Sequence, residues 1–328
     1  MALFALRPEF HARPWGRHEL APLYERPAGS TDPIGEVWLT SLECRVQGAA
    51  SPRAEETLAE LWARLSATER GAALAQVERF PLLVKFLFTS EKLSIQVHPG
   101  DDYARRHEGE PWGKSETWHV VAAAPEAAVY VGVNPDISRA QLAALFAKPQ
   151  GLERALVRHP LQAGDQVYVP AGTLHTIGPG LVLCEIQQYS DLTYRVYDYD
   201  RLGLDARPRA LHLEKARAVV RHPAPEAGRV KPRPLAGGRG RLLVTSPYFA
   251  VEKYEATEPL ALPREPAHFD LLVFCAGQGR VATARDRAGY QAGAALLVTA
   301  DAGPVEVLPS SRSELLRAYV PQQTQGKS

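Results

Sequence analysis

The amino-acid sequence predicts an all-β protein with helical insertions, built as two β-rich blocks. Short apolar, strand-like segments follow one another with only turns between them in residues 165–199, and the same pattern returns in residues 241–320. Strands joined by turns are typical of antiparallel barrels and sandwiches, whereas βαβ units require a helix between strands. Residues 222–240 are rich in Pro, Gly and Arg and predict a linker between the two blocks.

The first block begins with a strand at Gly35–Thr40 and continues with helical patterns. Ser51 can cap a helix, since the proline that follows it suits the first helical position. Ser66 and Glu69 form a capping-box pattern, which predicts a second helix running toward Val77. Apolar residues at helical spacing support the first of these helices: Leu58, Leu61, Trp62 and Leu65.

The rest of the first block is expected to be mainly extended. Phe80–His98 is apolar and strand-like. Ser138 with Gln141 predicts the start of a helical piece within residues 138–158. A loop and then a helix are expected in residues 203–219. Further strands are predicted at residues 115–122, 128–133 and 166–169.

The second block shows short strands separated by turns and no metal-ligand pair. Its one histidine is His268. We therefore expect a second barrel-like domain without a metal. Its predicted strands are residues 248–254, 269–274, 294–298 and 314–320.

Four residues of the first block have the chemistry and spacing of metal ligands. Gln96 and His98 stand two apart in a strand-like run, so a period of two aims both at one face. His175 follows a glycine turn, a strand and a Pro-x-Gly corner that redirects the chain. With Glu116, the set has one amide, two imidazoles and one carboxylate. It suits Zn²⁺ first, and Fe²⁺, Mn²⁺ or Co²⁺ next.

The assignment of Glu116 as a ligand has a structural alternative. Glu116 can equally form a salt bridge with Lys114 or Lys92. Among the other histidines, His119 faces away from Glu116 by strand parity and is expected to be structural, and His107 is expected on the surface.

The balance of charge excludes general electrostatic attraction to nucleic acid or anionic membranes. The chain of 328 residues has 38 basic and 37 acidic residues, so a phosphate must be held by a few local cations. The Arg-rich stretch 229–241 is expected to be a solvated linker. No apolar run approaches the ~20 residues that span a bilayer, and MALFALRPEF has no signal-peptide pattern.

The three cysteines indicate a reducing, cytoplasmic location. Cys44, Cys184 and Cys275 are odd in number, far apart and without C-x-x-C spacing. We expect them to be reduced and mostly buried.

Several longer segments together resemble the class I mannose-6-phosphate isomerases, which are zinc-dependent cupins. The segments are LSIQVHPGDDYA, GKSETWHV, VPAGTLHTIGPGLVLCEIQQYSDLTYRVYDYDR and ALHLEKA. The resemblance is to the shorter bacterial form and runs from about Pro8 to about Ala218. It implies a catalytic cupin (jelly-roll) barrel in residues 1–221 with helical insertions at about 51–78 and 138–158. A linker at 222–240 and a degenerate cupin-like domain without metal at 241–328 would follow.

The resemblance also implies roles for individual residues. Arg195 would be the active-site arginine, Lys114 and Glu185 would line the substrate pocket, and Ser94 would lie near the phosphate. One Zn²⁺ per chain would be held by Gln96, His98, Glu116 and His175. Two positions depart from the family: Asp101 stands where longer members carry lysine, and Thr176-Ile177-Gly178 replaces the usual asparagine after the second motif.

The implied reaction is the reversible isomerisation of D-mannose 6-phosphate and D-fructose 6-phosphate through an enediol(ate). The reaction needs a cationic group close to the sugar oxygens, and it needs a general base. Glu185, Lys114, a zinc-bound hydroxide and another histidine all remain candidates for the base. A zinc ion beside Lys114 would favour its neutral amine. Before the resemblance is considered, Arg195 could instead form a structural ion pair with Asp191 or Asp198.

Three other functions compete with this one. A cupin isomerase of another phosphosugar and an Fe²⁺ cupin oxygenase are alternatives among enzymes, although Gln96 in place of a first histidine argues against the oxygenase. A non-catalytic sugar-phosphate-binding or regulatory cupin is the third, and it would not need Lys114, Glu185 and Arg195 to converge on the metal. The expected partner is a small sugar phosphate, not nucleic acid or membrane, and the chain is expected to be a monomer or homodimer.

Overall fold

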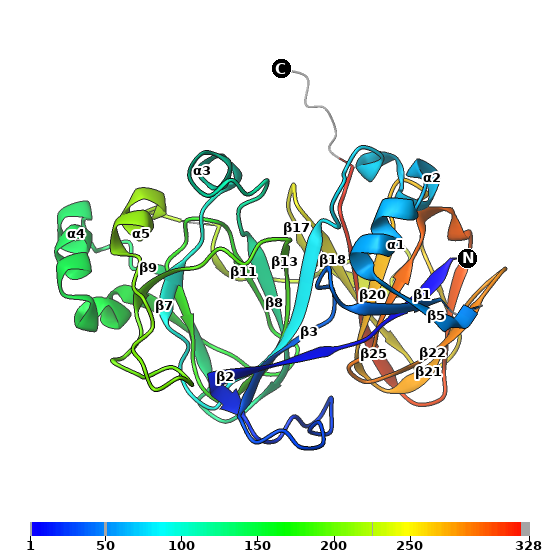
Figure 1. Ribbon diagram of the computed structural model, residues 1–328, viewed down its shortest axis with the longest axis horizontal. Helices are drawn as coiled ribbons and strands as arrows, with labels where there is room; N and C mark the ends of the chain where they lie inside the picture. Colours follow the sequence, from blue (N-terminus) through cyan, green and yellow to red (C-terminus); the bar gives the residue numbers. More distant parts are fainter. Residues whose placement is uncertain (1, 49–50, 225, 323–328) are drawn as a thin grey trace.

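The chain forms two β-rich halves that pack side by side (Figure 1). The computed structural model describes residues 2–48, 51–224 and 226–322. In Figure 1 the half with β7, β8 and β13 lies on the left and the half with β20, β22 and β25 lies on the right. None of the helices in the described residues is long and apolar enough to cross a membrane.

Two antiparallel sheets build the first half. The described residues give a five-stranded sheet in the order β10 (Leu156–Pro160), β9 (Ala128–Val133), β12 (His175–Ile177), β7 (Ile95–Val97) and β14 (Tyr194–Tyr197). The second sheet has seven strands in the order β15 (Gly228–Arg229), β11 (Gln166–Val169), β8 (Glu116–Ala123), β13 (Leu181–Gln188), β6 (Leu82–Phe88), β3 (Ile34–Trp38) and β2 (Glu9–Arg17). Trp118 and Val131, one from each sheet, share a buried apolar cluster between them.

The second half also consists of two sheets in the described residues. A nine-stranded sheet has the order β16 (Arg233–Pro234), β17 (Gly240–Thr245), β18 (Ala250–Ala256), β25 (Ser313–Tyr319), β20 (Asp270–Ala276), β23 (Ala295–Val298), β1 (Leu3–Leu6), β4 (Arg45–Gly48) and β5 (Ser51–Thr57). The four-stranded sheet is β19 (Leu260–Leu262), β24 (Val305–Pro309), β21 (Gln278–Thr283) and β22 (Arg287–Gln291).

The N-terminal strand belongs to the second half, so the sheets do not follow the predicted division at residue 221. Leu3 of β1 lies opposite Val298 of β23, and Phe4 lies opposite Gly48 of β4. β15, within the predicted linker, pairs with β11. Local sequence patterns do not report such pairings, because the partners are distant in the chain.

A shared apolar core joins the two halves. Phe86 and Cys184, from the outer face of the seven-stranded sheet, belong to the same buried cluster as Val273 and Leu297 of the nine-stranded sheet. Burial of this kind stabilises by about 25 cal/mol per Å² of apolar surface. The cysteines Cys44, Cys184 and Cys275 are all free and buried, as the sequence predicts.

The helices lie at the edges of the two halves. Near the second half are α1 (Leu58–Arg64), α2 (Ala67–Arg70), η1 (Ala72–Leu74) and η4 (Ala300–Ala302). On the first half are α3 (Asp101–Tyr103), η2 (Ala104–Glu108), α4 (Arg139–Ala147), η3 (Pro149–Ala155) and α5 (Leu213–Val219). Ser138 caps α4 through a capping box with Gln141, as predicted.

The predicted helix start at Ser51 is wrong. The chain from Ser51 is strand β5, which pairs with β4, and α1 begins only after its N-cap Thr57. The neighbouring strand supplies backbone hydrogen bonds, and this tertiary pairing overrides the local capping signal. The Ser66 capping box is confirmed, but α2 ends at Arg70, well before Val77.

His119 connects the two halves through a polar contact. Its Nε2 lies 2.9 Å from Oε1 of Glu314 on β25, and its Nδ1 lies 3.3 Å from Oε1 of Gln166. Lys253 of β18 pairs with the same glutamate at 2.8 Å. The structural role predicted for His119 is therefore confirmed.

Replacing Glu314 should weaken the contact between the halves in a pH-dependent way. Burial by itself raises the pKa of Glu314, but His119 and Lys253 outweigh it and lower the pKa from 4.5 to about 2. Because the folded-state pKa is the lower one, the stabilisation is present above pH 4.5 and is lost as the pH falls toward 2. Glu314→Gln should therefore reduce the free energy of unfolding by about 1–2 kcal/mol at pH 7.

Denaturant unfolding at pH 7, 5 and 3.5 checks this expectation, with the exposed Glu306→Gln on β24 as the control. The deficit of Glu314→Gln should shrink at pH 3.5. A deficit that is equal at all three pH values, or that the control shares, would contradict it.

Candidate active site

The register of the five-stranded sheet aligns three of the predicted site residues. His175 of β12 lies opposite Gln96 of β7, and Gln96 lies opposite Arg195 of β14. Glu116 is the first residue of β8, in the other sheet. Both sheets therefore contribute side chains to the same interior.

The predicted Pro-x-Gly corner places His175. Gly172 has φ +85°, a conformation that residues with a Cβ rarely adopt. Its amide donates to the carbonyl of His98 at 2.8 Å, and Thr173 closes a turn on the carbonyl of Pro170. The corner thus ties the segment of His175 to that of His98.

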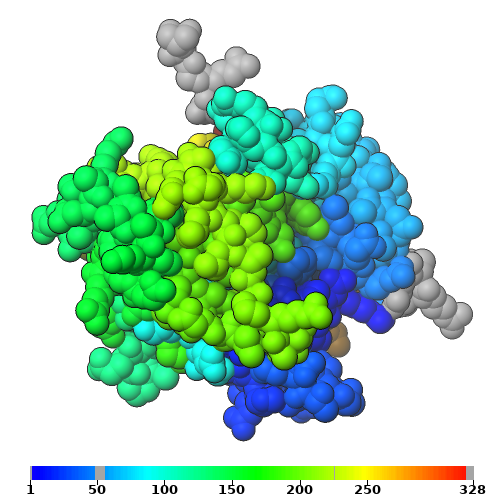
Figure 2. All heavy atoms as spheres, turned by 60° about the vertical axis from the view of Figure 1, so that its left-hand side comes forward, coloured from blue at the N-terminus to red at the C-terminus, as the bar shows by residue number. Residues whose placement is uncertain are grey.

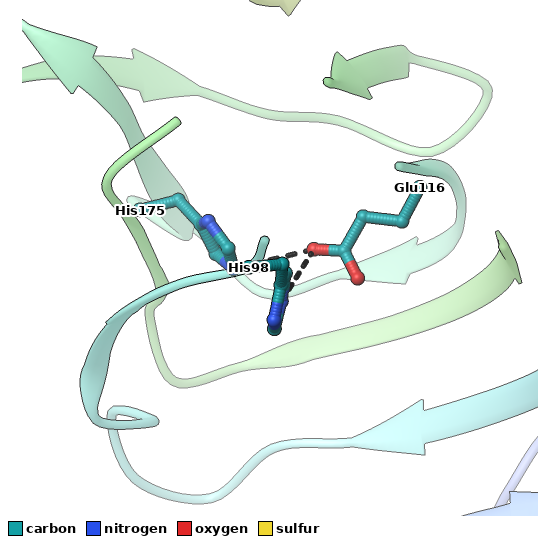
Figure 3. A group of neighbouring side chains, drawn as sticks. All are labelled: His98, Glu116 and His175. Atoms are coloured by element: carbon teal, nitrogen blue, oxygen red, sulfur yellow. Dashed lines mark ion pairs between the residues drawn. The ribbon is translucent and has the colours of Figure 1, made fainter. Parts of the chain in front are cut away.

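His98, Glu116 and His175 form a compact buried cluster (Figure 3). Oε1 of Glu116 lies 3.2 Å from Nε2 of His175 and 3.6 Å from Nε2 of His98. All three ligand atoms lie within 4.8 Å of one another, and the side chains are at most 1% exposed.

The outer nitrogens of both histidines are held by backbone carbonyls. Nδ1 of His98 lies 2.8 Å from the carbonyl of Leu192, and Nδ1 of His175 lies 2.9 Å from that of Thr173. A carbonyl only accepts, so each Nδ1 carries the proton and each Nε2 presents a lone pair. Burial lowers the pKa of both histidines, that of His98 most strongly. Both are therefore neutral, the form that binds metals.

The donor set fits a divalent metal ion. Nε2 of His98 and Oε1 of Glu116 are buried without a hydrogen-bond partner. Tetrahedral ligands at about 2.1 Å from zinc stand about 3.4 Å apart, close to the separations found here. The amide Nε2 of Gln96 lies 3.2 Å from Nε2 of His175. Rotating this amide group by 180° would place its oxygen, the atom that would bind a metal, where its Nε2 now lies.

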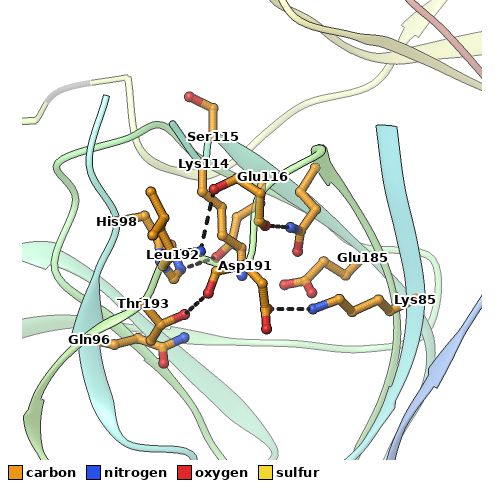
Figure 4. A network of polar contacts seen from close by, with 12 residues as sticks. Lys85, Gln96, His98, Lys114, Ser115, Glu116, Glu185, Asp191, Leu192 and Thr193 are labelled. Carbon is orange, nitrogen blue, oxygen red and sulfur yellow. Dashed lines mark hydrogen bonds and ion pairs between the residues drawn. The ribbon is translucent and has the colours of Figure 1, made fainter. Parts of the chain in front are cut away.

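Two further charged groups adjoin the cluster (Figure 4). Nζ of Lys114 lies 3.1 Å from Oε2 of Glu116, and Trp118 donates to Oε1 of Glu185 at 3.0 Å. Burial raises the pKa of Glu185 to about 7, and Lys114 offsets this only in part. Burial by itself lowers the pKa of Lys114, but Glu116 and Glu185 outweigh it and raise that pKa. The protein groups by themselves therefore favour the charged form of Lys114, whereas the sequence predicts its neutral amine beside a zinc ion.

A second buried lysine, Lys85, lies near the cluster and is not among the site residues predicted from the sequence. Lys85 of β6 is 2% exposed and pairs with Asp191 at 3.2 Å (Figure 4). It also lies 3.9 Å from Glu36 and over the ring of Trp38. The sequence feature that could have identified Lys85 is its position as the single charged residue in the otherwise apolar strand LLVKFLF.

The structure does not show the ion pairs considered for Arg195. Asp191 pairs with Lys85, and Asp198 pairs with Arg201 and Arg209. Arg195 instead donates from Nη1 to the carbonyl of Ala210 at 3.0 Å.

A cavity of about 580 Å³ brings these groups together. Its lining includes Ser94, Gln96, Lys114, Glu185 and Arg195. Ser94 donates from Oγ to Oε1 of Gln96 at 3.3 Å, so it lies beside the ligand cluster. Figure 2 shows the face where segments around residues 200–212 (yellow-green) and the N-terminal residues (blue) lie close together; both contribute to the lining.

Comparisons with known proteins agree with this geometry. A family model described as phosphomannose isomerase type I, catalytic domain, matches residues 3–127. The mannose-6-phosphate isomerase ManA of Bacillus subtilis is 34% identical over 281 residues, which cover 84% of this chain and 86% of that protein. The chain belongs to the type I phosphomannose isomerase family. The mannose-6-phosphate isomerase of Streptococcus mutans is 37% identical over 219 residues, covering 67% and 68%.

Solved structures of phosphomannose isomerases share the fold. The crystal structure of the mannose 6-phosphate isomerase from Bacillus subtilis superposes with a TM-score of 0.85 at 28% identity, over 97% of this chain and 99% of that one. A zinc-bound mannose 6-phosphate isomerase gives a TM-score of 0.78 at 18% identity, over 98% and 100%. The predicted family and the mostly-β cupin fold are both confirmed.

Removing one imidazole should abolish tight metal binding without unfolding the protein. His175→Ala should weaken Zn²⁺ binding about 100-fold or more, because it removes a ligand whose Nδ1 is held in place by the backbone. Competition with a chromophoric chelator measures this affinity. The control is His107→Ala, since His107 is exposed and stacks on Tyr103. Equal Zn²⁺ affinity in the two variants would contradict this assignment.

Proposed function

We propose that the cavity catalyses the family's reaction, the reversible isomerisation of D-mannose 6-phosphate and D-fructose 6-phosphate. One observation carries this proposal. The cluster of His98, Glu116 and His175 adjoins a cavity lined by Lys114, Glu185 and Arg195. The reaction needs positive charge, a proton carrier and a cavity in one place.

We propose one Zn²⁺ per chain as the cofactor, held by Gln96, His98, Glu116 and His175. Two neutral imidazoles, a carboxylate and an amide oxygen suit zinc. When bound, the metal supplies fixed positive charge that polarises the sugar's carbonyl and hydroxyl oxygens. The zinc-bound relative of the same fold supports this choice.

The protein's own residues would move the proton. Isomerisation takes the proton from C2 of the aldose and returns it to C1, while the O2 proton passes to O1. Glu185 is 4% exposed and is oriented by the indole of Trp118, and Lys114 is held by Glu116. Both line the cavity, so we propose these two as the acid/base groups. Their burial excludes bulk water, which would otherwise compete for the enediolate.

Arg195 would stabilise negative charge. It is the neighbour of Gln96 across the β7–β14 pairing, and it lines the cavity. A guanidinium at this place suits the developing oxyanion or the phosphate. Oγ of Ser94 lies 3.3 Å from the amide of Gln96; with the amide turned so that its oxygen can bind a metal, Oγ would accept from its Nε2 and hold that orientation, and we propose that Ser94 also lies near the substrate.

The convergence favours an enzyme over a non-catalytic sugar-phosphate-binding cupin. A binder does not need a buried lysine and glutamate beside the ligand cluster, and burying such groups costs free energy. The cytoplasmic location and the monomeric or homodimeric state stay proposals.

Turnover should depend on the metal and on Arg195. Chelator-treated protein should lose mannose 6-phosphate isomerisation and recover it with added Zn²⁺. His175→Ala should not recover, and Arg195→Ala should lose about 100-fold in kcat/KM, the usual loss for a residue that stabilises transition-state charge. A coupled assay of fructose 6-phosphate formation measures this, with circular dichroism as the control for folding. Full activity of the chelated protein, or absence of activity in the zinc-loaded wild type, would refute the proposal.

Solvent exchange should identify the proton carrier. In D₂O, wild-type enzyme should incorporate deuterium at C2 of mannose 6-phosphate. The variant that lacks the base should lose turnover and exchange by about 10²–10⁴-fold. Glu185→Gln and Lys114→Met are compared by NMR. Near-normal turnover in either variant would exclude that residue as the base.

A further inference from the structure

The chain after β14 forms a loop over the cavity that is held by one buried carboxylate. We call residues 198–212 the arginine loop. Asp198 accepts from Nε of Arg209 at 2.7 Å and from its Nη2 at 2.5 Å. It also accepts from Nη2 of Arg201 at 2.8 Å. Asp198 is 5% exposed, so a single buried carboxylate joins the two ends of the segment 201–209.

The arginine loop has little apolar packing to fix its shape. Leu202, Leu204 and Leu211 are 44–51% exposed, and they are the exposed large apolar side chains of the described residues. Its internal hydrogen bonds lie near the tip: Gly203 donates to the carbonyl of Arg207 at 2.7 Å, Ala206 donates to that of Gly203 at 3.0 Å, and Leu202 and Pro208 form an isolated bridge. The contacts of Asp198 hold the two ends of the loop together, and Arg201 also donates to the carbonyl of Lys92 at 2.7 Å and to Oε2 of Glu91 at 3.2 Å.

Arg195 depends on this loop for its own position. Its Nη1 donates to the carbonyl of Ala210, the residue directly after Arg209. The amide of His212 in turn donates to the carbonyl of Arg195 at 2.7 Å. Asp198 thus reaches Arg195 through the chain Arg209–Ala210, although it makes no ion pair with it.

Arg195 is also the lysine or arginine of the cavity lining that has no carboxylate partner among the described residues. The other lysines and arginines that line the cavity each pair with a carboxylate. Among the described residues no carboxylate oxygen lies within ion-pair distance of Arg195, and its Nε is buried without a hydrogen-bond partner. The pairs are Arg13–Glu36, Lys85–Asp191, Lys114–Glu116 and Arg209–Asp198.

We infer that Asp198 is a positioning residue for the phosphate end of the substrate. By holding Arg209 and the arginine loop, it keeps the unmatched guanidinium of Arg195 aimed into the cavity, where it selects phosphorylated sugars. This inference rests on the proposed function, and it assigns Asp198 no contact with the reacting carbons. A loss of Asp198 should weaken binding of the phosphate more than it slows the proton transfer.

The variant Asp198→Asn tests this inference, because it keeps the size of the side chain and removes its charge. KM for mannose 6-phosphate should rise about tenfold, while kcat changes less than about threefold. The inhibition constant of inorganic phosphate should rise by a similar factor, and the zinc content should stay unchanged. A purely structural role would lower the active fraction, and hence kcat, without moving KM or the phosphate constant.

A matched carboxylate elsewhere serves as the control. Asp165 also pairs with an arginine, Arg229, at 2.6 Å, but Arg229 does not line the cavity, whereas Arg209 does. Asp165→Asn should leave KM and phosphate inhibition within twofold of the wild type. If Asp198→Asn does not fold, Arg209→Gln leaves the Asp198–Arg201 pair in place and should give the same rise in KM.

The outcomes separate this inference from the proposed function. If zinc-loaded wild type does not turn over, calorimetric titration with inorganic phosphate still compares the variants. Weaker phosphate binding in Asp198→Asn then supports the positioning role even though the isomerase proposal fails. Unchanged KM and phosphate constants in both Asp198→Asn and Arg209→Gln overturn the inference, whatever happens to kcat.

Discussion

The burial of one carboxylate, Glu116, constrains the whole site. Its side chain is 0% exposed, and an ionised carboxylate taken out of water costs several kcal/mol unless positive charge or donors compensate. Burial by itself raises the pKa of Glu116, but the charge of Lys114 is the largest of the effects that outweigh it and lower that pKa. The charged form is therefore kept inside the protein. Together with the two neutral imidazoles, it gives a donor set that suits a divalent cation.

The register of the sheets places the polar groups of the site around one cavity. Neighbouring strands are about 4.8 Å apart, so His175, Gln96 and Arg195 lie in a row across three neighbouring strands. Glu116, with Lys114 just before it, approaches from the other sheet, and Glu185 lies on β13 next to β8. The proposed ligands and the proposed acid/base groups thus come from two opposing sheets. A one-residue slip of β7 would turn Gln96 and His98 to the other face together.

The second half supports the site from outside. The outer face of the seven-stranded sheet is covered by the nine-stranded sheet, and His119 of β8 reaches Glu314 across that contact. β8 therefore presents Glu116 to the cavity on one face and is anchored on the other. In the described residues, the mouth of the cavity has no such packed support. It is formed partly by the arginine loop, which has exposed leucines and is held by polar contacts. The sheets hold the proposed ligands, and the arginine loop carries Arg209 in the cavity lining.

The sequence by itself determined the features that depend on a few adjacent residues. The capping boxes at Ser66 and Ser138 are local, since their hydrogen bonds close within three residues. The strand at Gln166–Val169 and the corner before His175 follow local residue preferences, although their hydrogen bonds reach distant partners in β8 and at His98. The period of two was enough to predict that Gln96 and His98 serve one cluster. The family resemblance added Arg195, Lys114 and Glu185, and the structure places all three in the cavity lining.

Only the tertiary structure decided the features that depend on distant partners. Strand β5 replaced a predicted helix because β4 offers it a hydrogen-bonding edge, and β1 entered the second half because β23 and β4 flank it. The pairing of Lys85 with Asp191 and the Asp198 clamp on the arginine loop have no local pattern either. Ion pairs and strand pairings between remote segments depend on which surfaces the folded chain brings together, and no short window of sequence contains that information.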